Sequence, residues 1–379
     1  MIPFNIPTVT GKEEKYVLNV MKGVKFSGDG EYNKKCTAWF NNHLNPSRAL
    51  LTPSGTHALE MAVMLAGIGP GDEVIIPSYT FTSTATCVVM QGATPVFVDI
   101  RPDTMNIDEV LIEDAITERT RAIIPVHYGG VSCDMDHILE IAGRHKLVVI
   151  EDAAQGLMAT YKGRHLGTMG DFGCLSFHET KNIQCGEGGA LIINNMEYYE
   201  RAEIIREKGT DRSKFWRGEI DKYSWIDAGS SYLISELSAA FLYAQLEMAE
   251  EITYHRLAIW EEYREGLSEL CREYPLTMMQ VPEGKIHNAH IFYLKTGTAA
   301  LRDELIPELH RRGIWAVFHY VPLHSAAAGK KYGRFNGKDL YTSKDSARIL
   351  RLPMYHCMDA KDTARVIEEL RSTVPSLTG

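Results

Sequence analysis

The segment EVIIPSYTFTSTATCVVMQGATPVFVDI, residues 73–100, decides the fold class of this chain. EVIIP (73–77) and TPVFVDI (94–100) are short apolar runs rich in β-branched residues, and each predicts a strand. The stretch near residues 83–91 has helical character and lies between them. Two almost continuous apolar strands joined by a helix are typical of a parallel sheet that is covered on both faces.

The same alternation continues along the chain. A helix is predicted over residues 106–117 with Asn106 as its cap, then a strand over 121–127, a helix over 135–145 and a strand over 146–152. After Asp152 the pattern changes, because the strands predicted at 173–177 and 189–193 have no helix between them. We therefore predict a large sheet that is mostly parallel.

The C-terminal third reads differently. Residues 235–270 have helical periodicity, and the apolar segments 288–296 and 314–320 flank a helical segment at 301–313. We predict an α/β protein of two parts: a large α/β domain over residues 1–250 and a smaller α+β domain over residues 251–379. The N-terminal segment is expected to pack with the smaller domain.

The composition is that of an ordinary globular protein: 379 residues, 45% hydrophobic and 23% charged, with a net charge of −9. This acidic balance argues against a nucleic-acid surface and against a polybasic membrane patch. No apolar stretch approaches the roughly 20 residues that cross a bilayer, and the N-terminus lacks the pattern of a signal peptide. Seven scattered cysteines without a CxxC pair predict reduced thiols, no metal site and a cytoplasmic location.

Ligands of such sheets bind at the carboxyl ends of the strands. Near that edge, TPSGTHALEMAVMLAG (52–67) places Gly55 and Thr56 at the start of a predicted helix. Backbone N–H groups, hydroxyls and the helix dipole all stabilise a phosphate at such a position. Taken alone, the motif fits an ordinary helix N-cap better than a phosphate site.

Two further motifs bring ionisable groups to the same edge. In VVIEDAAQG (148–156), Asp152 ends a buried strand, where a carboxylate needs a partner. In CLSFHETKN (174–182), Lys181 follows an apolar run. A capping aspartate and a solvated strand-end lysine are the ordinary alternatives, and His178 and Glu179 of the second motif are interpreted as structural.

Together these features fit one cofactor, pyridoxal 5′-phosphate (PLP). Lys181 would bind it covalently, and Asp152 would keep its pyridinium nitrogen protonated so that the ring accepts electrons. Gln155 could hydrogen-bond the phenolic oxygen, and Ser176 could reach the phosphate. Phe81, in PSYTFTSTA (77–85), could stack on the ring, although a lone aromatic at a strand end is more often core.

With these residues assembled, the chain resembles the DegT-type sugar-nucleotide aminotransferases, which are fold type I PLP enzymes. Each motif alone is weak, but their ordered combination is specific, and it runs almost from end to end of the chain. The matching stretches are GDG (28–30), LLTPSGTHALEMA (50–62), GDEVIIPSYTFTSTA (71–85), VFVDIRPDTMNID (96–108), IEDAAQG (150–156), SFHETKN (176–182), GEGGA (186–190), REKGT (206–210) and VFHYVPLH (317–324).

The resemblance implies an enzyme with specified residues. It assigns the covalent lysine to Lys181 and the other cofactor contacts to Gly55, Thr56, Phe81, Asp152, Gln155 and Ser176. Many relatives have GxNYR where this chain has GSSYL (229–233), so Ser231 replaces an asparagine that reaches the phosphate of the neighbouring subunit. The resemblance also implies a homodimer with active sites at its interface.

The reaction implied by the resemblance transfers an amino group from L-glutamate to C4 of a dTDP-linked 4-keto-6-deoxyhexose, with pyridoxamine 5′-phosphate as the intermediate cofactor form. Glu187 and the basic stretch RSKFWR (212–217), which begins with Arg212, could face the sugar nucleotide, because a diphosphate needs cationic partners. His319 and His324 could also meet substrate, or simply finish a strand.

Three alternatives stay open at this point. A PLP-dependent deoxysugar dehydratase of the same fold would have a histidine in place of Lys181. An aminotransferase for another ketosugar would act at C3 or on a GDP- or UDP-linked substrate. A noncatalytic regulatory protein would keep the fold, but it would have little need of Lys181, Asp152 and Gln155 together.

Overall fold

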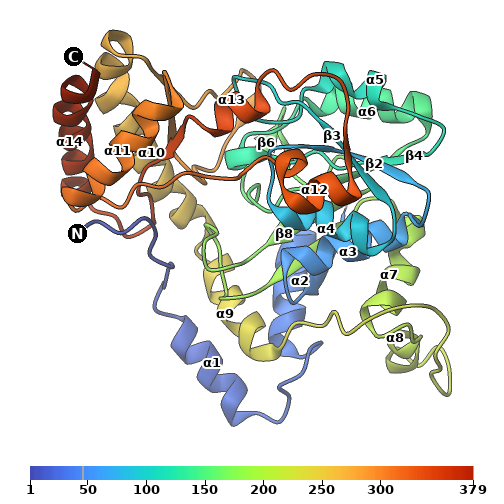
Figure 1. Cartoon of the computed structure of the whole chain (residues 1–379). Coiled ribbons are helices and arrows are strands. Elements are labelled where there is room, and N and C mark those ends of the chain that lie inside the picture. The colour runs from blue at the N-terminus through green and yellow to red at the C-terminus, as the bar shows by residue number, and fades with distance from the viewer. Residues whose placement is uncertain (45–46, 379) are drawn as a thin grey trace.

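The computed structural model describes residues 1–44 and 47–378, and an eight-stranded sheet forms its centre (Figure 1). Six neighbouring strands run parallel, and β9 is antiparallel to both of its neighbours. In order across the sheet, the strands are β1 (Arg48–Thr52), β9 (Gly189–Ile193), β8 (Phe172–Ser176), β5 (Val148–Asp152), β4 (Thr120–Ile123), β2 (Glu73–Pro77), β3 (Thr94–Val98) and β13 (Arg334–Phe335). The predicted α/β class and the mostly parallel sheet are therefore confirmed.

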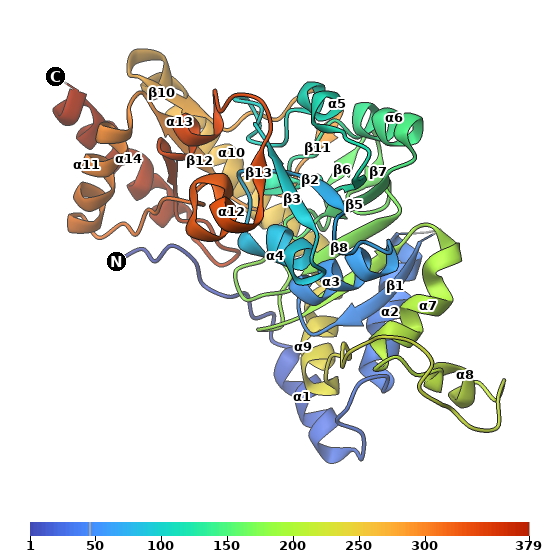
Figure 2. The ribbon, with the colours of Figure 1, turned by 45° about the vertical axis from the view of Figure 1, so that its right-hand side comes forward.

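Both faces of this sheet are covered by helices (Figure 2). Val74 and Ile76 of β2 pack on one side, whereas Ile75 packs on the other, as the period of two in a strand requires. The first face is covered by α3 (Gly55–Leu65), α4 (Thr82–Met90) and α7 (Tyr199–Arg206). The second is covered by α2 (Glu31–His43), α6 (Met135–His145) and α9 (Glu236–Leu246), with α5 (Ile112–Ala115) at its edge.

The prediction of one helix over residues 106–117 is wrong. The structure has only a 3₁₀ turn, Glu109–Leu111, followed by the single turn of α5, and Asp108 rather than Asn106 is the cap. The buried side chain of Asn106 instead accepts from the N–H of Tyr128 and donates to the carbonyl oxygens of Val131 and Ser132. The side chain of Asn106 therefore joins two loops and does not cap a helix.

The C-terminal residues surround a second core, at the upper left of Figure 1. A three-stranded antiparallel sheet, in the order β10 (Leu276–Met278), β12 (Tyr293–Thr296) and β14 (Ile349–Arg351), packs with α10 (Ala249–Glu273), α11 (Ala299–Arg311) and α14 (Ala360–Thr378). Ile2 is buried in the same core and forms a bridge with Ile314. The apolar segment 314–320 forms only isolated bridges and no strand.

One helix, α10, belongs to both cores. Ala249 and Ile252 lie in the core of the large sheet, whereas Ile259 and residues beyond it lie in the C-terminal core. The boundary placed at residue 250 stays a prediction.

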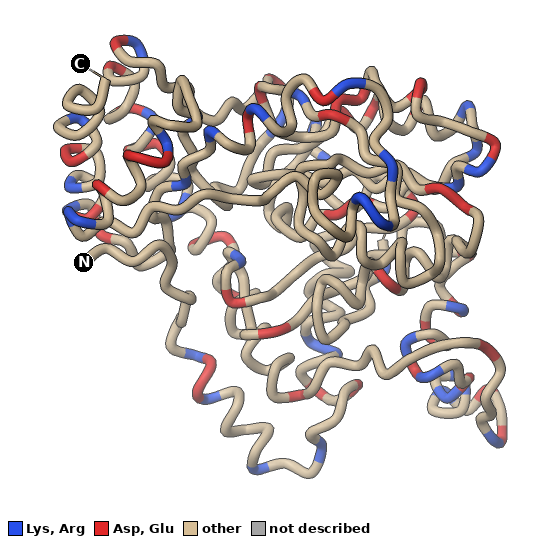
Figure 3. The backbone as a smooth tube through the Cα atoms, in the orientation of Figure 1, with Lys and Arg blue, Asp and Glu red and all other residues tan. Residues whose placement is uncertain are grey.

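The remaining elements are short connections. They are α1 (Glu13–Lys22), α8 (Arg212–Trp216), α12 (Ala327–Tyr332), α13 (Thr342–Ser346), the small sheet of β6 (Thr160–Tyr161), β7 (Arg164–His165) and β11 (Lys285–Ile286), and the 3₁₀ turns Tyr128–Gly130, Met196–Tyr198 and Leu323–Ser325. Acidic and basic residues are interspersed over the described part of the chain (Figure 3). None of the described helices is both long and apolar enough to span a membrane.

Candidate active site

A cavity of about 560 Å³ opens at the carboxyl ends of the parallel strands. Asp152 is the last residue of β5 and Ser176 is the last residue of β8, so the strands themselves deliver both side chains to this edge. Nine of the residues predicted for the site line this one cavity: Gly55, Thr56, Phe81, Asp152, Gln155, Ser176, Lys181, Glu187 and His319.

Asp152 is a buried carboxylate held by neutral donors. The hydroxyl of Thr84 donates to its Oδ2 at 2.8 Å, and the N–H of Ala154 donates to its Oδ1 at 3.2 Å. Burial raises the pKa of Asp152 above its ordinary value, and the bond from Thr84 opposes that shift. Among the described residues Asp152 has no ion-pair partner, so a cationic ligand would be strongly stabilised beside it.

Lys181 lies in the turn after β8, where its N–H donates to the carbonyl oxygen of His178 at 2.8 Å. Burial lowers the pKa of Lys181 to about 8; the charge of Asp152 opposes this shift and that of Arg351 adds to it. A lysine with such a pKa is partly neutral near neutral pH, and the neutral amine is the nucleophilic form.

The start of α3 forms the third side of the cavity. Ser54 is the N-cap, and its Oγ accepts from the N–H of His57 at 3.2 Å. Gly55 is packed so closely against β8 that an added Cβ would lie 2.8 Å from the Cβ of Ser176. The first N–H groups of a helix have no acceptor within it, so this end of α3 can bind an anion beside the hydroxyls of Thr56 and Ser176.

Gln155 and Phe81 frame the rest of the predicted cofactor site. Oε1 of Gln155 accepts from the N–H of Gly129 at 2.6 Å, and its Nε2 donates to the hydroxyl of Tyr320 at 3.0 Å. Phe81 is 56% exposed, and its ring centroid lies 6.1 Å from that of Tyr320. An exposed aromatic face at the cavity is free to stack on a planar ring.

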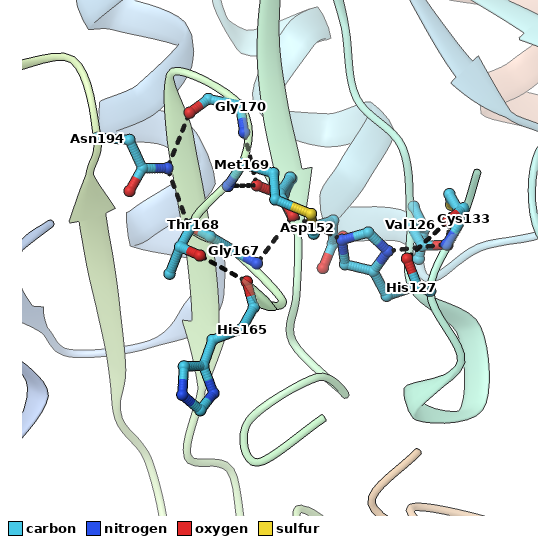
Figure 4. Close-up of polar contacts among 12 residues, drawn as sticks. Val126, His127, Cys133, Asp152, His165, Gly167, Thr168, Met169, Gly170 and Asn194 are labelled. Atoms are coloured by element: carbon cyan, nitrogen blue, oxygen red, sulfur yellow. Dashed lines mark hydrogen bonds and ion pairs between the residues drawn. The ribbon is translucent and has the colours of Figure 1, made fainter. Parts of the chain in front are cut away.

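Glu151 and His127 form a buried pair next to Asp152. Figure 4 shows His127 and the loop residues Gly167, Met169 and Gly170. The Glu151 carboxylate accepts from the N–H groups of Gly167, Met169 and Gly170, and His127 Nε2 lies 2.9 Å from it. Because Nδ1 of His127 accepts from the N–H of Cys133, the proton of this imidazole is on Nε2 and donates to Glu151. The backbone N–H of His127 donates to the backbone carbonyl oxygen of Asp152 at 3.1 Å.

Two of the four predicted substrate residues reach the cavity. Glu187 is exposed at its mouth, with its Oε1 3.7 Å from Nε2 of His178. His319 is stacked on Tyr320 with ring centroids 3.6 Å apart, and its Nδ1 lies 2.6 Å from the hydroxyl of Tyr128. Burial holds the pKa of His319 well below its ordinary value, so the imidazole is neutral.

The structure does not bring the other three predicted site residues to this cavity. Arg212 lies on α8, away from the sheet (Figure 1). Its guanidinium lies over the rings of Trp216 and Tyr223. Nδ1 of His324 lies 2.6 Å from the hydroxyl of Ser78, and its Nε2 lies 3.2 Å from Asp339, so its predicted contact with substrate stays a prediction. Ser231 is exposed on the loop before α9, and its predicted contact across a subunit interface stays a prediction.

Sequence reasoning missed two arginines that line the cavity, Arg256 and Arg351. The guanidinium of Arg256 is buried and donates to the carbonyl oxygens of Ala289, His290 and Met354. Neither arginine stands in a recognisable motif, and their elements belong to the C-terminal core. The apolar sequence LRLP around Arg351 is the only local signal, because a charged residue inside a buried strand needs a reason.

Residues 7–371 match the DegT/DnrJ/EryC1/StrS aminotransferase family. The chain belongs to this family. It is also 36% identical over 372 residues to the GDP-perosamine synthase of Caulobacter vibrioides, and the match covers 96% of each chain.

Solved structures agree with this membership. DesV of S. venezuelae, in complex with a ketimine intermediate, is 32% identical, with a TM-score of 0.89 and 98% of each chain covered. Spr1654 of Streptococcus pneumoniae in its PLP-form is 26% identical, with a TM-score of 0.89 and 100% of each chain covered. The prediction of a DegT-type family member with an aminotransferase fold is confirmed.

Proposed function

We propose that this sugar aminotransferase uses PLP to move an amino group from L-glutamate to C4 of a dTDP-linked 4-keto-6-deoxyhexose. The products are 2-oxoglutarate and a dTDP-4-amino-4,6-dideoxyhexose of galacto configuration. One observation carries the chemistry: Lys181, with its lowered pKa, and the buried Asp152, which has no ion-pair partner among the described residues, line the same cavity beside the start of α3.

The cofactor predicted from the sequence, PLP, is confirmed by membership in the aminotransferase family and by the PLP-form of the similar Spr1654. The residues present fit it. The close approach of Gly55 to Ser176 leaves backbone N–H groups and hydroxyls around a space for the phosphate. The carboxylate of Asp152 supplies the negative charge that a protonated ring nitrogen needs.

Each side chain then has one task. Bound PLP supplies an electron sink to the substrate carbon attached to it. Nζ of Lys181 would hold the cofactor covalently at rest and, once released, would carry a proton to and from the α-carbon of the amino donor. Asp152 would hold the proton on the ring nitrogen, and Gln155 would donate to the phenolic oxygen from the Nε2 that bonds Tyr320 in this structure.

The choice of C4 and dTDP rests on the resemblance of the ordered motifs to dTDP-4-amino-4,6-dideoxygalactose transaminase, which serves enterobacterial common antigen synthesis. A specific observation favours a second candidate, a GDP-linked 4-ketosugar, because a 36% identical relative is a GDP-perosamine synthase. We further propose a cytoplasmic homodimer in which Ser231 faces the partner subunit.

The first experiment is the visible spectrum of the PLP-loaded protein before and after addition of L-glutamate alone. We expect the visible absorption band to fade and the band of pyridoxamine 5′-phosphate to replace it. The loaded protein is then mixed with dTDP-4-keto-6-deoxyglucose or with a GDP-linked 4-ketosugar, and the aminated product is identified by mass spectrometry. An unchanged band with L-glutamate would contradict the proposed donor, and amination of the GDP sugar alone would contradict dTDP.

A further inference from the structure

Thr84 has a buried hydroxyl to which the proposed reaction gives no task. It is the third residue of α4, and its side chain is completely buried. A threonine inside a helix often donates to a carbonyl oxygen of the preceding turn, as Thr253 does to Ala249 at 2.7 Å. Thr84 instead donates out of its helix, to Oδ2 of Asp152 at 2.8 Å. Its only proton is therefore committed to a carboxylate of the candidate site.

A second threonine extends this bond into a chain. Oγ1 of Thr80, another buried side chain, lies 2.9 Å from Oγ1 of Thr84, and Thr80 lines the cavity. Because the proton of Thr84 goes to the carboxylate, Thr84 accepts in this contact and Thr80 is the donor. The chain therefore runs in one direction, from Thr80 through Thr84 to Asp152, and each bond strengthens the next.

The two carboxylate oxygens of Asp152 are held by one donor each. Thr84 donates to Oδ2, and the N–H of Ala154 donates to Oδ1 at 3.2 Å. These two bonds fix the plane of the carboxylate, and each oxygen keeps an unused lone pair for a further donor. Burial raises the pKa of Asp152, and the bond from Thr84 is the largest of the effects that oppose it. Removal of this one hydroxyl therefore makes the carboxylate a stronger base.

Among the described residues, no other ionisable group near Asp152 takes over this role. Lys181 would be bound to the cofactor at rest, and the ring proton of His127 already goes to another carboxylate. The thiols of Cys87 and Cys174 are neutral, because burial and the charge of Asp152 raise the pKa of each. The ionised carboxylate therefore depends on the threonine hydroxyl as its side-chain donor.

We propose that Thr84 is a positioning residue of the amino transfer, whose hydroxyl keeps the proton shared by Asp152 and the ring nitrogen of PLP on that nitrogen. The inference rests on the proposed function, whose electron sink requires the protonated nitrogen. A proton between two bases stays on the stronger one, and a hydrogen bond to a carboxylate weakens it as a base. Without the hydroxyl, the proton moves toward Asp152, and less electron density is drawn from the carbon at which Lys181 acts.

The test is ¹⁵N NMR of the protein loaded with PLP that carries ¹⁵N in its ring, without any amino donor. Protonation of a pyridine nitrogen moves its resonance strongly, so the resonance reports where the shared proton lies. We expect a protonated nitrogen in the wild type and an intermediate resonance in Thr84→Val, which keeps the shape of the side chain but has no hydroxyl. The proton equilibrium should shift toward Asp152 by about 10- to 150-fold, the loss of a hydrogen bond to a charged group.

Three further variants separate this role from a merely structural one. Thr84→Ser keeps the hydroxyl and should restore the resonance of the wild type. Thr86→Val is the matched control, because Thr86 is exposed on the same helix, and it should also keep that resonance. Thr80→Val removes the outer bond of the chain, so its resonance should move in the same direction as that of Thr84→Val, but less.

The second readout is the rate of the first half-reaction with L-glutamate, followed by stopped-flow absorbance. Thr84→Val should slow it by up to the same factor of about 10- to 150-fold, because a less protonated ring is a weaker electron sink. Thr84→Ser and Thr86→Val should react as the wild type does. Thermal melting and PLP content establish that all variants are folded and loaded.

The proposal is overturned if Thr84→Val keeps the ring-nitrogen resonance of the wild type, or if the nitrogen of the wild type is unprotonated. A larger effect of Thr80→Val than of Thr84→Val would also overturn it, because the chain orders the two effects. If the wild type fails to react with L-glutamate, the proposed donor is wrong. The resonances are recorded without a donor, so they still decide whether Thr84 holds the proton on the ring.

Discussion

The amine of Lys181 is tuned by two charges of opposite sign in one cavity. Burial and Arg351 lower its pKa, and Asp152 raises it, with a value of about 8 as the result. Asp152 thus keeps the lysine from losing its proton entirely in the free protein. The same carboxylate is available to the ring nitrogen once the cofactor is bound.

This balance predicts a pH dependence. Because the neutral amine reacts with the aldehyde, capture of PLP by the apoprotein should accelerate as pH rises through about 8, not through the ordinary lysine value near 10.4. Asp152→Asn should move the midpoint down, and Arg351→Gln should move it up. Stopped-flow absorbance from pH 6 to 10 measures these rates, and a midpoint above 10 in the wild type would exclude the lowered pKa.

Removal of the lysine itself gives the strongest expected loss. Lys181→Ala should lower turnover by at least about 10²- to 10⁴-fold, the usual contribution of general acid–base catalysis, while PLP still binds noncovalently at the start of α3. Coupled assay of 2-oxoglutarate release gives the rate, and equilibrium dialysis gives the bound cofactor. Lys162→Ala, at an exposed lysine, is the control. Normal turnover without Lys181 would contradict the assignment.

Among single residues of the site, those that stand in compact motifs could be predicted from the sequence. Asp152, Gln155 and Lys181 each end or follow a strand of predictable direction, so the shared edge of the sheet brings them together. Arg351 and Arg256 were missed because they reach the cavity from the C-terminal core, which no local pattern places above the sheet. Arg212 lies outside the cavity, with its guanidinium over aromatic rings, and its predicted contact with the substrate stays a prediction.

Among the elements, α3 begins in close contact with β8, where a Cβ added to Gly55 would lie 2.8 Å from the Cβ of Ser176. Gly55→Ala should therefore push α3 away from Ser176, weaken PLP binding and destabilise the protein by about 1–3 kcal/mol. Gly143→Ala, in the last turn of α6 with open space around it, should instead stabilise by about 0.5–1 kcal/mol. Urea denaturation and PLP titration check both variants. Equal PLP affinity in Gly55→Ala and wild type would show that α3 does not hold the phosphate.

The loop between β7 and β8 is held by one carboxylate. Glu151→Gln replaces an acceptor of three backbone N–H groups and one imidazole N–H with a group that has only one acceptor atom. Buried donors left without acceptors cost about 1–3 kcal/mol each, so a loss of several kcal/mol is expected. Guanidinium denaturation measures it, with Glu197→Gln at an exposed site as control. A change below about 1 kcal/mol would mean that the loop finds other acceptors.

Element prediction succeeded where hydrophobic periodicity was strong. The strands at 73–77 and 189–193 and the helix at 135–145 have the predicted bounds. It failed at 106–117, where the apolar spacing was helical but the side chain of Asn106 bonds three backbone groups of a distant loop. Tertiary hydrogen bonds there outweigh local propensity.

The C-terminal segment reaches back across the molecule and completes the large sheet. The two residues of β13 add an eighth strand beside β3, and Arg334 binds the buried Glu73 together with Arg119. A two-residue strand carries no sequence signal, so this connection could not be predicted. It fixes one end of the segment that carries His319 and Tyr320 to the cavity.

Two arginines on one carboxylate allow a matched test of that role. Arg334→Ala and Arg119→Ala both remove a partner of Glu73 and should each destabilise by about 1–3 kcal/mol at neutral pH. The Arg334 bond lowers the pKa of Glu73, so its contribution is present above the ordinary glutamate value and is lost as pH falls through the lowered one. The variant and the wild type should therefore converge in acid.

Only Arg334→Ala should also loosen residues 318–341, because Arg119 does not contact that segment. Hydrogen exchange followed by mass spectrometry reports the local opening, and urea denaturation at several pH values reports the stability. Equal exchange of residues 318–341 in both variants would contradict the anchoring role of β13.

The 25 residues of α10 form a rod of about 37 Å that is shared by two cores. Its first turn completes the interior beneath the sheet, and the rest is the backbone of the C-terminal core, with Arg256 tied to three carbonyl oxygens between them. In a chimaera joined at residue 250, α10 would come from one parent, but the core of the large sheet against which its first turn packs would come from the other parent. Recombination among such enzymes is expected to succeed at a crossover before α9, which keeps this rod and both of its contact surfaces from a single parent.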